Sequence, residues 1–177
     1  MKKILFPTDG SKIAGHALDV ALDLAELHGA QILLFHAILR DKEPEELLNL
    51  NILADDQNLT EELKVLAEGK KRSAAIEEIL SNPNLPEKYV PPELLQKIGD
   101  LILNAAQRVC EKRNLKSEIL PVNGLAAAEG IVGTVEDLNP DMIVLGMRGL
   151  RQIESMTFGS VSSDVCRSVS CRCIAVH

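Results

Sequence analysis

The chain is poor in aromatic residues: Phe, Trp and Tyr make up 2% of its 177 residues, and there is no tryptophan. Proteins that bind single-stranded nucleic acid commonly stack bases on aromatic rings, so this composition argues against that class. It also requires an aliphatic core, since hydrophobic residues still make up 46% of the chain. That share, with 25% charged residues, is ordinary for a globular protein.

Positive charge is also in deficit. The chain has 19 Lys and Arg against 26 Asp and Glu, a net charge of −7. Nucleic acid and anionic membranes repel such a protein, so we expect neither as a partner. A small anionic ligand held by backbone N–H groups remains compatible with this charge.

The sequence lacks long apolar runs. No stretch approaches the roughly 18 apolar residues of a membrane-spanning helix. The apolar run near the start is too short for a signal peptide and is interrupted by Pro7 and Asp9. We therefore expect a cytoplasmic protein.

Cysteine is scarce as well, and its spacing matches no zinc-binding pattern. A cytosolic setting also disfavours disulfides. We expect the cysteines to be small core residues rather than metal or redox groups. They are Cys110, Cys166, Cys171 and Cys173.

Short β-branched runs alternate with segments of helical periodicity. A strand, a helix and a second strand favour a parallel β-α-β unit with a right-handed crossover. Its repetition predicts an open, doubly wound α/β sheet in one domain, residues 1–177. Pro121 lacks an N–H, so its strand is expected at an edge. Strands are predicted at 3–7, 31–38, 116–122, 141–145 and 171–176, and helices at 12–28, 93–113, 126–138 and 161–169.

Residues 40–92 leave this pattern and form an acidic insertion after the second strand. A capping signal at 58–61 and spaced leucines predict a helix to about Leu80, weakened near Gly69. Turns are predicted at 82–86 and 90–92. The insertion is expected at the C-terminal edge of the sheet as a lid, a dimer element or a solvated decoration. Runs of charge usually form solvated surfaces, which favours decoration.

The stretch with the most chemical content follows the fourth strand. It consists of Gly146-Met147-Arg148-Gly149, nine further residues, and Gly159-Ser160. The glycines allow a sharp turn and close approach of a ligand, and Ser160 is expected to cap a helix. A helix N-terminus with free N–H groups suits phosphate. A plain strand-loop-helix connection accounts for the same residues about equally well, because Gly-x-x-Gly is a weak signal.

The first strand ends in Pro7-Thr8-Asp9, and Gly10-Ser11 already supplies a turn and a helix cap. Asp9 is therefore expected to face a ligand, although a capping role would also explain it. The second strand ends in His36-Ala37, and we expect His36 to pack there rather than act as a base. Together with the glycine-serine stretch, these motifs resemble the ATP-binding members of the universal stress protein family.

The resemblance implies strand order 3-2-1-4-5 in an adenine-nucleotide alpha-hydrolase-like fold. In that order the winding reverses between the first and fourth strands, where ligands enter such sheets. The resemblance also implies nucleotide contacts for Pro7, Thr8, Asp9, Ala37, Gly146, Gly149, Gly159, Ser160, Val161 and Ser162. Arg148 either pairs with a phosphate through its charge or stays solvated.

Each part of this implied site has its own role. Residues 7–9 are placed near the nucleoside, and Ala37 is placed against adenine through its backbone. Gly146 and Gly149 approach the ribose and phosphates, which residues 159–162 hold.

The predicted function is binding of ATP, or of ADP or AMP, with Mg²⁺ held through the phosphates, in a regulatory stress response with little hydrolysis. No catalytic base is evident beside the phosphate motif, and no Walker Gly-x-x-x-x-Gly-Lys-Ser/Thr occurs. Two alternatives remain: a slow ATPase or adenylyl-transfer enzyme, and a nucleotide-free interaction module. The resemblance also implies a homodimer through the last strand, Cys173 to Val176, and an unnamed protein partner.

Overall fold

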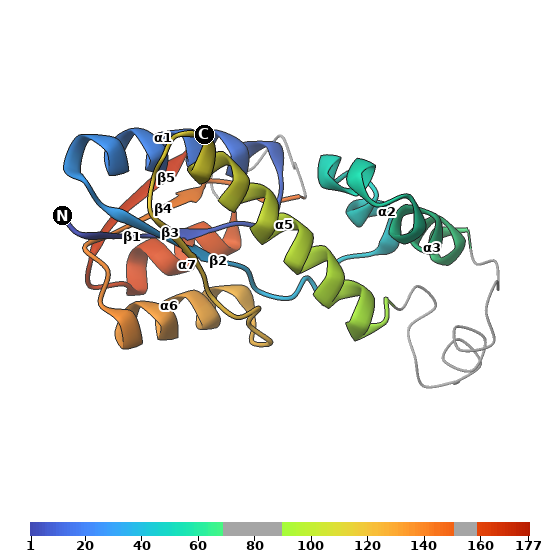
Figure 1. Cartoon of the computed structure of the whole chain (residues 1–177). Coiled ribbons are helices and arrows are strands. Elements are labelled where there is room, and N and C mark those ends of the chain that lie inside the picture. Colours follow the sequence, from blue (N-terminus) through green and yellow to red (C-terminus); the bar gives the residue numbers. More distant parts are fainter. Residues whose placement is uncertain (69–89, 151–158) are drawn as a thin grey trace.

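A five-stranded parallel sheet organises the molecule (Figure 1). The computed structural model describes residues 1–68, 90–150 and 159–177. The strand order is β3-β2-β1-β4-β5, which confirms the predicted topology and the edge position of the third strand. The strands are β1 (Lys3–Pro7), β2 (Gln31–Phe35), β3 (Ser117–Ile119), β4 (Met142–Gly146) and β5 (Arg172–Val176).

The central strands are apolar because helices cover both of their faces. Side chains alternate along β1, so Ile4 and Phe6 join the core on one face while Leu5 joins the core on the other. The predicted strand at 31–38 is too long: β2 ends at Phe35, and Ala37 forms an isolated bridge to Asn123.

Helices of the described ranges cover both faces of the sheet (Figure 1). Helices α1 (Lys12–His28) and α5 (Pro92–Lys112) cover one face, and α6 (Ala127–Leu138) and α7 (Ser160–Ser168) cover the other. Within the described ranges, no helix is long and apolar enough to cross a bilayer.

The described part of the insertion has a core of its own. It comprises α2 (Pro44–Leu47), the 3₁₀ helix η1 (Asn51–Asp55) and α3 (Gln57–Ala67), which Figure 1 shows beyond the carboxyl ends of the strands. Their leucines pack with the first half of α5 in a cluster that we call the second core. Its buried members are Leu39, Leu47, Leu50, Leu53, Leu59, Leu63, Leu66, Val90, Leu94, Leu95, Ile98 and Ile102.

The second core corrects the expectation of a solvated decoration for these residues. The charges of α3 lie on its outer side, where Glu61 and Lys64 are exposed, while its leucines are buried. The predicted cap at 58–61 is also wrong, because Asp56 accepts the Leu59 N–H at 2.9 Å and caps the helix. The predictions for 69–80 and 82–86 lie outside the described residues.

A disulfide joins Cys166 on α7 to Cys173 on β5, with Cα atoms 5.7 Å apart. The expectation of unpaired core cysteines is therefore wrong for this pair. It was based on the cellular compartment, whereas the packing of α7 against β5 decides which sulfur atoms meet. Cys110 is free and buried, as predicted, and burial raises the pKa of its thiol.

Reduction of the Cys166–Cys173 disulfide should lower the stability of the folded chain. A bond across a separation of 7 residues closes a short loop, for which chain entropy predicts about 2 kcal/mol. For a chain of this size that corresponds to a fall in Tm of roughly 5 °C. Thermal unfolding with and without dithiothreitol measures the effect.

A Cys171→Ser variant is the control, since Cys171 is free and the disulfide remains. Its Tm should respond to reductant as the parent protein does, whereas Cys166→Ser should not respond. Equal Tm values for the oxidised and reduced parent, with the two states verified by mass, would contradict a stabilising disulfide.

Candidate functional site

The loop between β1 and α1, residues 8–11, is a compact turn. Gly10 has φ +76°, a left-handed conformation that favours glycine, and its N–H donates to Thr8 Oγ1 over 3.1 Å. Ser11 Oγ accepts the Ala14 N–H at 3.2 Å, so Ser11 is the N-cap of α1. Asp9 is therefore not the cap, and its carboxylate is available to another partner.

Asp9 joins this loop to the loop after β4. Its Oδ1 accepts the Ser11 N–H at 3.0 Å, and its Oδ2 accepts the Leu150 N–H, also at 3.0 Å. Gly149 lies so close that a Cβ atom on it would be 2.6 Å from Oδ2. The structure thus brings two of the predicted motifs together at the point where the winding of the sheet reverses.

Helix α7 begins at Ser160, and Gly159 is its N-cap. The prediction that Ser160 caps the helix is wrong, because the extended backbone of an N-cap occurs at Gly159, with φ −74° and ψ 157°. The hydroxyl that anchors this turn belongs to Ser162. It is buried and donates to the Met147 carbonyl at 2.7 Å, with the Gly159 carbonyl at 3.0 Å as a second acceptor.

The first turn of α7 presents backbone donors. An α-helix leaves its first N–H groups without an internal acceptor, and here the N–H groups of residues 160–162 precede the first helical bond, from Ser163 to Gly159. Nearby, Arg148 Nε is buried and has no hydrogen-bond partner among the described residues. An anion with several oxygens is the ligand that would satisfy these donors.

Two predicted site residues have structural roles in the strand ends. Pro7 is buried as the last residue of β1. Gly146 ends β4 against α1, where a Cβ atom would lie 3.2 Å from the Ile13 side chain and 3.3 Å from the Ala14 nitrogen. The glycine at 146 therefore allows α1 to pack closely on β4, whatever it contributes to a ligand.

Ala37 lies two residues beyond the end of β2 and is 7% exposed. The bridge to Asn123 uses the carbonyl of His36 and the N–H of Ile38, at 2.9 and 2.8 Å. In a parallel bridge the residue between them turns its own N–H and C=O to the opposite side. The backbone of Ala37 therefore faces away from Asn123, as a backbone contact with a base requires.

His36 packs at the strand end, as expected. Its side chain is 1% exposed, and its Nδ1 lies 2.8 Å from the Thr8 carbonyl oxygen. Burial lowers the pKa of His36 from the ordinary 6.5 and outweighs three effects that raise it: the hydrogen bond to Thr8 and the charges of Asp9 and Asp100.

The sequence does not predict a role for Leu150. Its N–H binds Asp9, and its side chain packs against the second core, so it connects the candidate site to the insertion. Nothing in its residue type signals this role, because the contact is made through the backbone. The one feature of the sequence that points to Leu150 is its position directly after Gly149 in the predicted glycine motif.

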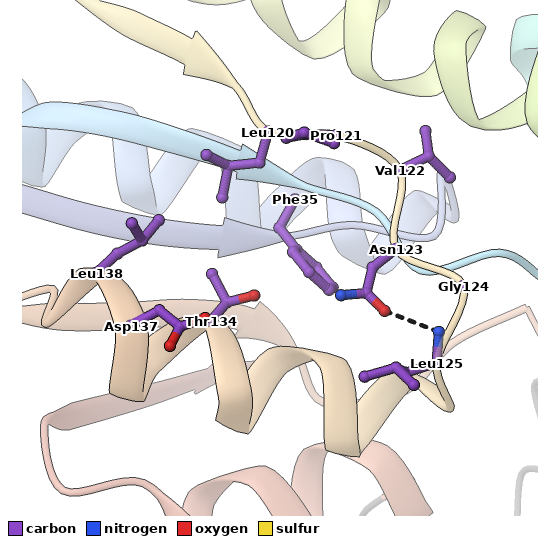
Figure 2. A pocket seen from close by; sticks show the side chains of 10 residues that line it. All are labelled: Phe35, Leu120, Pro121, Val122, Asn123, Gly124, Leu125, Thr134, Asp137 and Leu138. Atoms are coloured by element: carbon purple, nitrogen blue, oxygen red, sulfur yellow. Dashed lines mark hydrogen bonds between the residues drawn. The ribbon is translucent and has the colours of Figure 1, made fainter.

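A hollow in the described part of the chain lies away from these loops. It has a volume of about 530 Å³ and lies between the β3 edge and α6 (Figure 2). Asn123 stands on its rim, where its Oδ1 accepts the Leu125 N–H at 2.8 Å. The lining residues are Phe35, Leu120, Pro121, Val122, Asn123, Gly124, Leu125, Thr134, Asp137 and Leu138.

The model of the universal stress protein family matches residues 1–177. The chain belongs to this family. It is 23% identical over 177 residues to the universal stress protein YxiE of Bacillus subtilis, which covers 99% of this chain and 98% of the relative.

Solved universal stress proteins share this fold. UspA from Lactobacillus plantarum matches with a TM-score of 0.63 and 20% identity, over 99% of this chain and 97% of that one. A family protein from Arabidopsis thaliana, solved with AMP bound, matches with a TM-score of 0.57 and 13% identity, over 99% and 91%. These similarities establish the architecture of this universal stress protein.

Proposed function

We propose that this universal stress protein binds an adenine nucleotide at the loops that follow β1 and β4, where the winding of the sheet reverses; we call this place the crevice. One observation carries the proposal. Asp9, in the loop after β1, contacts Gly149 and Leu150, in the loop after β4, and the free backbone N–H groups at the start of α7 lie beside them. The family member solved with AMP supports this ligand class.

The described residues suggest how the nucleotide would lie. The backbone of Ala37 would meet the base, and Asp9 and Thr8 would lie near the nucleoside. The N–H groups of residues 160–162 would bind phosphate oxygens, and Arg148 would add charge. Within the described ranges no three metal-ligating side chains gather, so any Mg²⁺ would be held mainly through the phosphates.

The proposed role is regulatory, in a cytoplasmic stress response, with little hydrolysis. Among the described residues of these two loops, Asp9 carries a carboxylate, and both of its oxygens already accept backbone N–H groups. His36 directs Nδ1 to a carbonyl and is buried, so neither group is placed to activate water. A slow ATPase or adenylyl-transfer activity is the competing proposal.

The first experiment is to denature the purified protein and identify any nucleotide it releases. We expect an adenine nucleotide by mass spectrometry, and titration calorimetry with ATP, ADP and AMP in Mg²⁺ should then rank the three. No released nucleotide, together with no heat of binding at millimolar ligand, would exclude both nucleotide proposals. Turnover well above a buffer blank, lost in Asp9→Ala, would favour the enzyme.

We also propose that β5 pairs with its copy in a homodimer and that residues 1–177 act as one domain. Four residues of the edge strand β5, Cys173 to Val176, are apolar and only partly buried. In the neighbouring strand β4, by contrast, the three middle residues are buried. A free apolar edge is normally covered by another strand, and a second copy offers the matching edge.

A further inference from the structure

His36 is a buried histidine whose tautomer is determined by its surroundings. Its Nδ1 lies 2.8 Å from the Thr8 carbonyl, which can only accept, so Nδ1 carries the proton. Its Nε2 is buried and has no partner among the described residues. The neutral ring therefore fits this position, while a second proton would place an unpaired N–H in the interior.

Helix α5 makes room for this ring at Gly99. A Cβ atom there would lie 2.8 Å from His36 Cδ2 and 3.3 Å from Nε2. Glycine inside a helix disfavours folding by about 1 kcal/mol relative to alanine. The close approach of the His36 ring explains why glycine occupies position 99 despite this cost.

The contact with Thr8 controls the direction of a peptide group in the candidate site. A trans peptide is planar, with its C=O and N–H pointing opposite ways. Because His36 binds the Thr8 carbonyl, the N–H of Asp9 in the same peptide is turned away from the ring. The direction of this peptide also sets the position of the Asp9 Cα, from which the side chain extends. The Asp9 carboxylate then accepts the hydrogen bond from the Leu150 N–H.

We propose that His36 is a positioning residue of the nucleotide site: wedged against Gly99, it holds the Thr8–Asp9 peptide in the direction that lets Asp9 bridge to Leu150 and meet the ligand. The proposal rests on the proposed nucleotide function. His36 itself touches neither the crevice nor the ligand, because it is buried behind the loop.

The charges around the ring set the direction of the pH dependence. The charges of Asp9 on the β1–α1 loop and of Asp100 on α5 favour protonation of the ring. Val122, which precedes α6 and lies beside the same Gly99 position as the ring, is uncharged. Burial dominates and keeps the pKa below 6.5. The neutral ring therefore prevails at pH 7.5. Protonation as the pH falls below that pKa leaves the Nδ1 donor on Thr8 but creates an unpaired N–H at the buried Nε2, which favours displacement of the ring from the loop.

The test compares His36→Asn with His36→Leu. The asparagine amide can occupy the position of Nδ1 and donate to Thr8, whereas leucine fills space without a donor. At pH 7.5 we expect His36→Leu to bind ATP or AMP at least tenfold more weakly than the parent, and His36→Asn within about threefold. Gly99→Ala, which displaces the ring, should also weaken binding, while Gly133→Ala should not.

Acidification separates positioning from a merely structural role. Nucleotide phosphates titrate too, but equally for every variant. Parent affinity should therefore fall more steeply from pH 7.5 towards 5 than that of His36→Asn. Superimposable pH profiles, or His36→Asn as weak as His36→Leu, would overturn the proposal.

Two readouts need no nucleotide. The ¹⁵N spectrum of the parent should show His36 protonated at Nδ1 alone, and hydrogen exchange of the Leu150 amide should be faster in His36→Leu than in His36→Asn. If the parent binds no nucleotide, the proposed function fails, and these readouts still decide whether His36 positions the loop. Equal exchange in both variants, or a proton on Nε2, would refute it.

Discussion

Gly149→Ala is expected to weaken nucleotide binding by at least about tenfold. The added Cβ would lie 2.6 Å from Asp9 Oδ2, closer than carbon and oxygen can approach, so the carboxylate or the loop must move. The same oxygen accepts the Leu150 N–H, and a hydrogen bond to a charged group contributes about 1.5–3 kcal/mol. Loss of that bond separates the two walls of the crevice. Calorimetric titration with AMP or ATP measures the change.

Gly133→Ala is the matched control for this substitution. Gly133 lies inside α6, and a Cβ on it meets nothing within 4 Å. Alanine is favoured over glycine there by about 1 kcal/mol, so the Tm should rise slightly and the affinity should stay the same. Parent-like affinity in Gly149→Ala would mean that the contact with Asp9 has no part in binding.

Leu63→Ala is expected to lower the free energy of unfolding by about 2–5 kcal/mol, as for other leucines buried in a core. Leu63 lies in α3 of the insertion and is fully buried, at 0% exposure. An insertion that only decorated the surface would show no such cost. Chemical denaturation followed by circular dichroism gives the free energy directly.

Leu27→Ala provides the same chemical change without burial. Leu27 is 76% exposed on α1, so its truncation should change the free energy of unfolding by less than about 0.5 kcal/mol. Similar values for the two variants would show that the leucines of α3 do not form a cooperative core in solution.

Local signals were sufficient for the elements whose limits are set by their own residues. The helix predicted at 12–28 is found at Lys12–His28, because Ser11 caps it and Gly29, at φ +62°, ends it in the left-handed conformation. The strand order came from the family resemblance, and Pro121 independently placed the third strand at an edge. The remaining strands and the helices that cover them were predicted from the spacing of apolar residues.

Features that depend on distant contacts could not be predicted in the same way. Asp9 and Leu150 are 141 positions apart, and their hydrogen bond exists only because β1 and β4 are neighbours. The second core could not be predicted from the sequence, because its segment is rich in charged residues and composition does not show which side of α3 its leucines face. The pairing of Cys166 with Cys173 likewise depends on how α7 packs on β5.

The second core has a consequence for whether the insertion can be separated from the sheet. An insertion that packs only on itself can be removed without exposing the rest of the molecule. This one shares its apolar face with Ile98 and Ile102 of α5 and with Leu150 beside the crevice. Deleting the insertion would expose those side chains to water, so a shortened chain would need polar residues at these positions to avoid an exposed apolar patch.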